Sequence, residues 1–222
     1  MKLFSFFLFI SFNLFSQNNL IDSNGFKQGY WQLYFPYNSD SIVSEEGNFL
    51  NNLEDGMWIK YHENGHVREI VNYKEGKLNG IRVVIGKRGK LEEQELFLNG
   101  KYNGKQIYFH DTGKVSSEFN YSDGVLNGPA VKYYRNGKKQ ESINYVNGKK
   151  NGISKWYFDN EQLSIKYTYV NGLISDTSYT YYKEGQLKST VVYFENELNG
   201  EKIVYYPSGI VKETGKFING KK

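Results

Sequence analysis

The chain has 222 residues, of which 39% are hydrophobic, 23% charged and 17% aromatic, with a formal net charge of +4. The 28 basic and 24 acidic residues are interspersed along the sequence, so no basic stripe or tail of the kind that binds nucleic acid is present. The sequence contains no cysteine, which excludes disulfides, thiolate metal sites and cysteine nucleophiles.

Residues 1–16 have the pattern of a signal peptide. Lys2 precedes an apolar run from Leu3 to Phe15, and the small residue Ser16 stands where signal peptidase would cut. The run is too short to span a bilayer. The alternative is a buried N-terminal strand or helix. We predict cleavage after Ser16 and a periplasmic or extracellular mature chain, with no stable membrane insertion after cleavage.

A lead-in or partial repeat follows at residues 17–28, and the remainder, residues 29–222, is a repeat array with a period of 24 residues. Three glycine series mark equivalent positions of about eight units. They are Gly56, Gly80, Gly104, Gly128, Gly152, Asp176 and Gly200; Gly65, Gly89, Gly113, Gly137, Glu161, Gly185 and Gly209; and Gly76, Gly100, Gly124, Gly148, Gly172, Asn196 and Gly220. Gly29 begins an earlier unit that has three extra residues.

Each unit is predicted to be a β-hairpin. Columns of large apolar residues that begin at Tyr61 and Tyr73 keep the same period, and the segments between glycines are β-prone and too short for helices. The sequence between the two segments of a unit, as in Glu63-Asn64-Gly65, suits a three-residue loop that ends in a left-handed glycine. Asn-Gly pairs such as Asn79-Gly80 are predicted to be the turns that join successive units.

The three-residue loop sets Tyr61 opposite Val67. We expect it to place Ile59, Tyr61, Val67, Val71 and Tyr73 on one face of the sheet. A hairpin alone is only marginally stable in water, so neighbouring units must pair edge to edge. The fold class predicted is therefore all-β: an elongated single-sheet array of about eight antiparallel hairpin repeats.

The pattern of one unit resembles a known repeat. Gly-x-Trp-x-x-Tyr-x-x-x-Gly, from Gly56 to Gly65, and Asn-Tyr-x-x-Gly, from Asn72 to Gly76, are similar to the bacterial variant of the MORN repeat. The resemblance covers nearly all of the mature chain. It implies a protein- or lipid-associating scaffold, and members of this family are often labelled antitoxin-like components of toxin–antitoxin modules. It implies no catalytic residue.

The polar residues do not predict catalysis or metal binding. His62 and His110 occupy the same column two units apart, roughly 20 Å from one another, so they cannot share a metal ion. Glutamates recur about once per unit, as at Glu69, Glu93 and Glu141, and such repetition is typical of solvated or salt-bridged ladders rather than of an active site. We therefore predict no enzyme activity, no cofactor and no metal.

One column is predicted to bind a partner. The residue after each member of the Tyr61 column is aromatic in the last four units, at Tyr134, Phe158, Tyr182 and Tyr206, on the opposite face from that column. These four residues and Trp156 are the predicted binding residues. The alternative is that the twisted sheet covers part of this face itself.

The sequence thus predicts an exported, non-enzymatic scaffold that binds a protein partner, with antitoxin-like or immunity-like neutralisation as one instance. A cell-wall or glycan-binding module is the alternative, because a spacing of about 10 Å per unit is close to the disaccharide repeat of an extended glycan.

Overall fold

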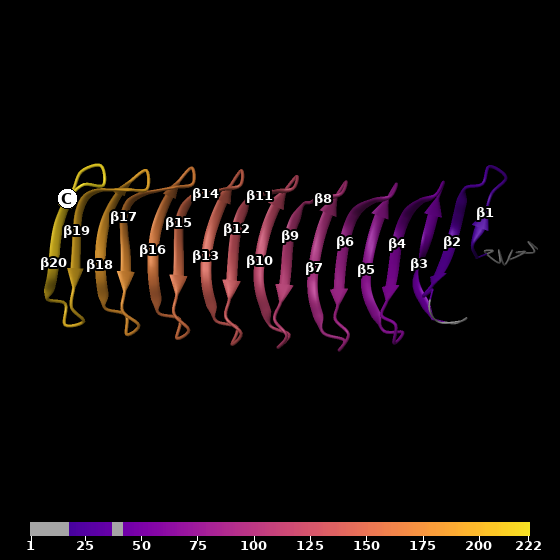
Figure 1. Cartoon of the computed structure of the whole chain (residues 1–222), viewed down its shortest axis with the longest axis horizontal. Helices are drawn as coiled ribbons and strands as arrows, with labels where there is room; N and C mark the ends of the chain where they lie inside the picture. The colour runs from indigo at the N-terminus through magenta and orange to yellow at the C-terminus, as the bar shows by residue number, and fades with distance from the viewer. Residues whose placement is uncertain (1–17, 37–41) are drawn as a thin grey trace, which may run out of the picture.

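A computed structural model describes residues 18–36 and 42–222, so the predicted signal peptide lies outside the described residues. Within them the chain forms twenty β-strands and no helix, paired in one open antiparallel sheet (Figure 1). No helix that could cross a membrane occurs in this part of the chain. The all-β prediction and the single-sheet prediction are confirmed.

The strands lie side by side in the order of the sequence, as the colour gradient of Figure 1 shows, and the long strands pair with their neighbours on both sides. The two-residue strands β8, β11 and β14 pair only with the strand before them. Their bounds are β1 Leu20–Ile21, β2 Lys27–Tyr34, β3 Val43–Leu50, β4 Leu53–Tyr61, β5 Val67–Lys74, β6 Lys77–Ile85, β7 Leu91–Leu98, β8 Lys101–Tyr102, β9 Gly104–Phe109, β10 Val115–Ser122, β11 Val125–Leu126, β12 Gly128–Tyr133, β13 Lys139–Val146, β14 Lys149–Lys150, β15 Gly152–Tyr157, β16 Leu163–Val170, β17 Leu173–Tyr181, β18 Leu187–Phe194, β19 Glu197–Tyr205 and β20 Val211–Phe217.

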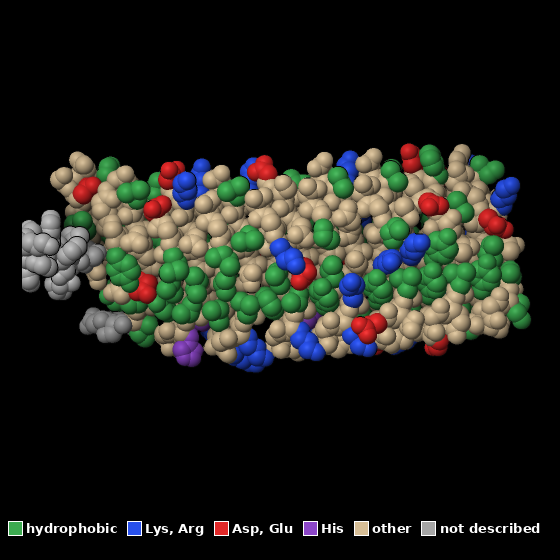
Figure 2. All heavy atoms as spheres, turned by 180° about the vertical axis from the view of Figure 1, so that it is seen from behind, with side chains coloured by type: hydrophobic (Ala, Val, Ile, Leu, Met, Phe, Trp, Pro, Cys, Tyr) green, Lys and Arg blue, Asp and Glu red, His purple; other side chains and the backbone are tan. Residues whose placement is uncertain are grey.

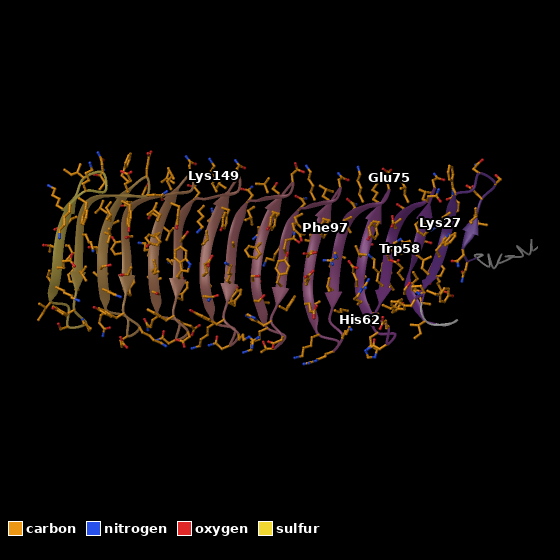
Figure 3. The ribbon with its side chains drawn as sticks, viewed as in Figure 1. Lys27, Trp58, His62, Glu75, Phe97 and Lys149 are labelled. Carbon is orange, nitrogen blue, oxygen red and sulfur yellow. The ribbon has the colours of Figure 1, made fainter. Side chains whose placement is uncertain are left out.

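The hairpin loops have the predicted geometry. In the β4–β5 hairpin Tyr61 pairs with Val67, and the backbone N–H of His62 donates to the carbonyl of His66 at 2.8 Å. Gly65 ends the loop with a φ of 82°, in the left-handed region that favours glycine. These loops form one edge of the array, where Figure 3 places His62, and we call it the hairpin-loop edge.

The turns that join successive units were predicted at the wrong residues. They are two-residue turns at the third glycine series, such as Glu75-Gly76, with φ values of 51° and 72° and Lys74 paired to Lys77. Two consecutive positive φ angles are those of a type I′ turn. The Asn79-Gly80 pair lies inside β6, where Gly80 has a φ of 106° next to an irregularity of the register. Figure 3 shows Glu75 at this opposite edge, which we call the turn edge.

The predicted face assignment is also wrong in part. Lys60 pairs with Glu69 and Tyr61 pairs with Val67, so Arg68 is an extra residue, a β-bulge, on β5. Because of this bulge, Ile59, Tyr61 and Val67 lie on one face, whereas Val71 and Tyr73 lie on the other with Trp58. We call these the Tyr61 face and the Trp58 face. The two aromatic columns are therefore on opposite sides of the sheet.

The most buried side chains lie on the Trp58 face. Trp31, Phe49, Trp58 and Val71 form a cluster in which both aromatic contacts are edge-to-face, with ring centroids 5.7 and 4.8 Å apart. Trp58 packs directly on Gly47, where an added Cβ would lie 2.4 Å from the indole ring. Its indole N–H donates to the carbonyl of Asn48 at 3.0 Å. The first hairpins thus depend on a glycine that leaves room for a tryptophan of the next unit.

The residues equivalent to Trp58 in later units are small or polar but still buried. They include Gln106, Ala130, Ser154 and Ser178. The Gln106 amide accepts from the N–H of Leu96 at 2.8 Å and donates to its carbonyl at 3.0 Å, beside the irregularity of the register. The same carbonyl also accepts from the backbone N–H of Asn103 at 2.9 Å. The position equivalent to Trp58 is therefore buried in each of these units, but the group that fills it differs from unit to unit.

The non-glycine residues in the glycine series keep the glycine conformation. Glu161, Asp176 and Asn196 have φ values of 73°, 72° and 72°. The repeat geometry therefore continues through these units, and the left-handed conformation is imposed on residues that disfavour it.

Replacing Glu161 by Gly is expected to raise the free energy of unfolding by about 0.5–1 kcal/mol. A non-glycine residue in the left-handed region destabilises the folded state by about 1–2 kcal/mol. The greater conformational freedom of glycine in the unfolded chain offsets about 0.4–1 kcal/mol of the gain from removing this strain. Urea denaturation of both proteins measures the difference. Gly185→Glu, at the equivalent loop position, is the reverse change and should destabilise; a gain in stability there would contradict the explanation.

Candidate functional site

A band of apolar side chains runs along the Tyr61 face from the first units to the last. Figure 2 shows it as a continuous green band nearer the hairpin-loop edge. All of its members are half-buried, and we call it the apolar stripe. They are Ile59, Val83, Ile107, Val131, Tyr179 and Ile203; Tyr61, Ile85, Phe109, Tyr133, Tyr157, Tyr181 and Tyr205; and Val67, Leu91, Val115, Leu163 and Leu187.

A carboxylate lies beside the stripe in the first units. Glu46 accepts hydrogen bonds from the hydroxyls of Tyr30 and Tyr61 and from the amide of Gln32. These donors lower the pKa of Glu46. The hydrogen bond to Glu46, together with burial, raises the pKa of Tyr61 to about 12. Both groups keep their ordinary charge states at neutral pH, and they hold the first hairpins together rather than moving protons.

The predicted binding column connects neighbouring units. We call it the latch series: Phe35, His62, Gly86, His110, Tyr134, Phe158, Tyr182 and Tyr206. The hydroxyls of Tyr134 and Tyr182 donate to the carbonyls of Tyr157 and Tyr205, 23 residues further on, at 2.7 and 2.8 Å. His62 and His110 place Nε2 2.9 Å from the carbonyls of Ile85 and Tyr133. Since a carbonyl only accepts, each Nε2 carries the proton.

The predicted binding residues differ in exposure. Tyr206 is 48% exposed, with the Lys212 ammonium 5.6 Å from its ring centroid, whereas Tyr134, Phe158 and Tyr182 are half-buried. The sheet therefore covers part of this column, as the alternative interpretation expected, and binding by these residues stays a prediction. The recurrence of His or Tyr in this column, both of which carry a donor at the tip, is the sequence signal that could have predicted the latch.

Trp156 lies apart from the latch series, on the Trp58 face. Its ring makes an edge-to-face contact with Tyr167 at 5.8 Å, and the Lys150 ammonium lies 5.6 Å from its centroid. Tyr167 also contacts Tyr169 and Tyr193. The structure therefore does not join Trp156 with the other four predicted residues in one site.

A charged cluster on the Trp58 face was not predicted. The Arg82 guanidinium pairs with Glu69, with Glu93 at 2.8 Å and with Glu95 at 2.6 Å, and Lys60 pairs with Glu69 at 3.2 Å. Glu95 is only 2% exposed, and its second oxygen accepts from the hydroxyls of Tyr102 and Tyr108 at 2.8 and 3.0 Å. Every charge therefore has a partner of the opposite sign.

The cluster shifts the titration of its members. Burial works against ionisation of Glu69, but hydrogen bonds from Arg82 and the charge of Lys60 outweigh it, so its pKa is lowered. Burial and the hydrogen bonds to Tyr102 and Glu95 raise the pKa of Tyr108 well above its usual range. These shifts keep Glu69 ionised and the phenols of Tyr102 and Tyr108 neutral, as a structural ion network requires.

The described residues contain no group of three or more His, Asp or Glu side chains that could hold a metal ion. Three of the recurrent glutamates are used in ion pairs: Glu69 and Glu93 with Arg82, and Glu141 with Lys132 at 3.5 Å. Glu213, the fourth glutamate of this column, is exposed and forms no ion pair within the described residues. This agrees with the solvated or salt-bridged role that the sequence predicted for them.

Comparison with known proteins identifies the repeat type. Five segments match the MORN repeat variant: residues 54–75, 102–123, 126–147, 150–171 and 198–219. Each segment spans a hairpin, its loop and the first residue of the following turn. No curated protein matches the chain. The family match is to a repeat unit, so it supports an array of similar units and assigns no catalytic residue.

Replacing Tyr134 and Tyr182 by Phe is expected to cost about 0.5–1.5 kcal/mol of unfolding free energy for each hydroxyl, because each mutation removes one partly buried hydrogen bond. Phe occurs naturally at position 158 of the same series, so the ring itself is tolerated. Thermal and urea unfolding measure the loss. Tyr206→Phe is the control, since its hydroxyl has no partner among the described residues; an equal loss there would contradict the latch.

Acid should weaken the protein through the Arg82 cluster and Glu46. A carboxyl whose pKa is lowered by folding stabilises the folded state above its unfolded pKa of about 4.3, and that stability is lost as the pH falls through the folded value. We expect a constant unfolding free energy from neutral pH to about pH 5 and a fall below about pH 4.

Arg82→Met provides the comparison for this pH profile. It should cost about 3 kcal/mol at pH 7, because the buried carboxylates lose their partner. In this variant those carboxyls gain protons more readily when folded, so stability should rise as the pH falls towards 4. Parallel pH profiles of the two proteins would disprove the role of Arg82.

Proposed function

We propose that this protein is a non-enzymatic scaffold that binds a protein partner along the apolar stripe. The observation that carries the proposal is an apolar band that runs the length of one face of a single sheet, with no second layer over it among the described residues. Contiguous apolar surface of this extent on a soluble protein is typical of an interaction site. The five repeat matches support the proposal, because repeat arrays commonly present extended binding surfaces.

The shape of the stripe favours an extended partner. The stripe crosses the strands and follows the long axis of the array (Figure 2), so a segment lying along it would contact every unit in turn. Tyrosine supplies many of its members, and tyrosine offers a large contact area at a low cost in conformational entropy. A long amphipathic helix or an extended segment with regularly spaced apolar residues would fit such a surface.

Charged side chains in and beside the stripe make its two ends different. Lys139 and Lys155 replace apolar residues of two stripe columns in the C-terminal half, whereas Glu46 lies beside the stripe in the first units. A partner would need acidic groups near the lysines and apolar groups between them. Charge placement of this kind selects orientation and rate of association more than affinity.

Export and the nature of the partner are part of the same proposal. The pattern of residues 1–16 supports an exported chain, in which the scaffold acts in the periplasm or outside the cell. Neutralising a toxin-like partner is one activity that such a surface would serve. Glycan binding is the less favoured alternative, because the hydroxyls of Tyr134 and Tyr182 bond to the neighbouring unit rather than facing solvent.

The stripe is tested with lysine substitutions at Val83 and Val131, in the column where Lys155 already occurs. The mature chain carries a photo-crosslinking amino acid at Tyr133 and is irradiated in extracts of the native host. We expect a protein adduct that the double variant Val83→Lys, Val131→Lys loses by more than about tenfold, because desolvating a lysine at an apolar contact costs more than 1.4 kcal/mol.

Val125→Lys with Val146→Lys is the matched control. Both valines lie near the turn edge and are 46% and 41% exposed, so the same chemical change is made off the stripe. This control should keep the adduct, and circular dichroism should show the same β signal for both double variants. An adduct that survives the stripe variant, or that is a polysaccharide, would refute the proposal.

A further inference from the structure

The latch series is interrupted once by a glycine. At Gly86 no side chain is available to cross to the next unit, and no described side chain donates to the carbonyl of Phe109, the atom equivalent to the carbonyls that His62, His110, Tyr134 and Tyr182 reach. The five repeat matches leave out residues 76–101, which contain Gly86, and also residues 172–197, which contain Tyr182. This unit therefore departs from the others at the position where they connect.

A hollow of about 700 Å³ lies at this interruption, between the hairpin loops of β6–β7 and β9–β10. Gly86 and Leu91 line it on one side, and Tyr108, Phe109 and His110 line it on the other. The hollow thus combines an unfilled position of the latch series with aromatic and apolar walls; a hollow of about 620 Å³ also lies at the preceding junction, where the ring of His62 is present. Its dimensions are those of a ligand site rather than of a packing defect.

The rim of the hollow carries cations. Lys87, Arg88 and Lys90 belong to its lining. Lys87 and Arg88 form no ion pair within the described residues, and Lys90 donates to the backbone carbonyl of Asp111. Three acidic residues also line the hollow: Glu93 and Asp111 are paired, with Arg82 at 2.8 Å and Arg135 at 3.4 Å, and Glu92 forms no ion pair within the described residues. Two cations are therefore available to an incoming anion.

Glu92 occupies the place of the missing side chain. A Cβ added at Gly86 would lie 2.1 Å from the Glu92 Oε1, so this carboxylate fills part of the space that a ring takes in other units. Glu92 is exposed and at the end of a flexible chain, so it can move aside. The site thus accommodates the carboxylate of Glu92, and an acidic group of a ligand would take the place of this carboxylate.

We propose that the Gly86 hollow is a docking site for an aromatic side chain carried by an acidic segment of a partner protein. The ring would fill the gap in the latch series beside Gly86 and Tyr108, and a phenol or indole donor would reach the Phe109 carbonyl. Carboxylates flanking the ring would pair with Lys87 and Arg88. The proposal rests on the proposed function, since it names one anchor point of the protein-binding surface.

The probe is the fluorescein-labelled peptide acetyl-Glu-Glu-Tyr-Glu-Glu-amide, titrated with the mature chain and followed by fluorescence anisotropy. Two further peptides separate the contributions: Tyr replaced by Ala retains the charge, and all four Glu replaced by Ser retain the ring. We expect the parent peptide to bind more tightly than either, with an affinity that falls as salt is raised.

Gly86→His is the central variant. It restores the latch found at His62 and His110, so it should fold at least as stably, and it should weaken the parent peptide by more than about tenfold by filling the hollow. His62→Tyr changes the same column in a unit that does not line the hollow and should leave binding unchanged. Glu92→Ala should tighten binding by about two- to fivefold, because it removes a like charge.

A second test changes the charge of the rim, so its result does not depend on whether Gly86→His folds. Lys87→Glu with Arg88→Glu should abolish binding of the parent peptide and favour a Lys-Lys-Tyr-Lys-Lys peptide instead. Failure of the parent peptide to bind the unmodified chain, or equal binding by Gly86→His, would overturn the proposal. The crosslink at Tyr133 does not depend on Gly86. An adduct that still forms in either case would therefore continue to support partner binding along the apolar stripe.

Discussion

Each unit of this sheet can bury apolar surface only against the units beside it, because no second layer covers either face among the described residues. This constraint explains why the positions that repeat every 24 residues are positions of contact between units. Trp58 packs on Gly47 of the preceding hairpin, Gln106 completes the backbone pairing of Leu96, and Tyr134 bonds to the carbonyl of Tyr157. Stability is then a property of neighbouring pairs, as in other solenoid-like arrays, rather than of one central core.

The same constraint makes departures from the repeat informative. The unit of residues 78–99 carries Arg82 where other units have Trp, Gln, Ala, Ser or Lys, and Gly86 where they have a ring. Arg82 brings three glutamates into one network, which buried charges tolerate only when each is paired. Gly86 leaves a hollow beside free cations. One unit thus departs from regular packing at two positions, and it is there that the array acquires chemistry that its neighbours lack.

Much of the local structure could be predicted because turns have strong residue requirements. The Glu63-Asn64-Gly65 loop and its pairing of Tyr61 with Val67 follow from a left-handed glycine at a fixed spacing. The joining turns were predicted at the wrong residues because two turn signals, Glu75-Gly76 and Asn79-Gly80, lie close together and both suit positive φ. The turn forms at Glu75-Gly76, where it allows Tyr73 to pair with Leu78. The faces were misassigned because the bulge at Arg68 has no residue signature of its own.

By itself, the sequence determined the period, the strands, the hairpin loops and the all-β array, since these depend on glycine conformation and on alternation within a few residues. Only the tertiary structure decided which aromatic columns share a face, because one bulged residue reverses all the side chains beyond it. It also decided the roles of Tyr134 and Tyr182, whose acceptors lie 23 residues away on the next unit. Contacts across a junction depend on register between strands, which no local pattern encodes.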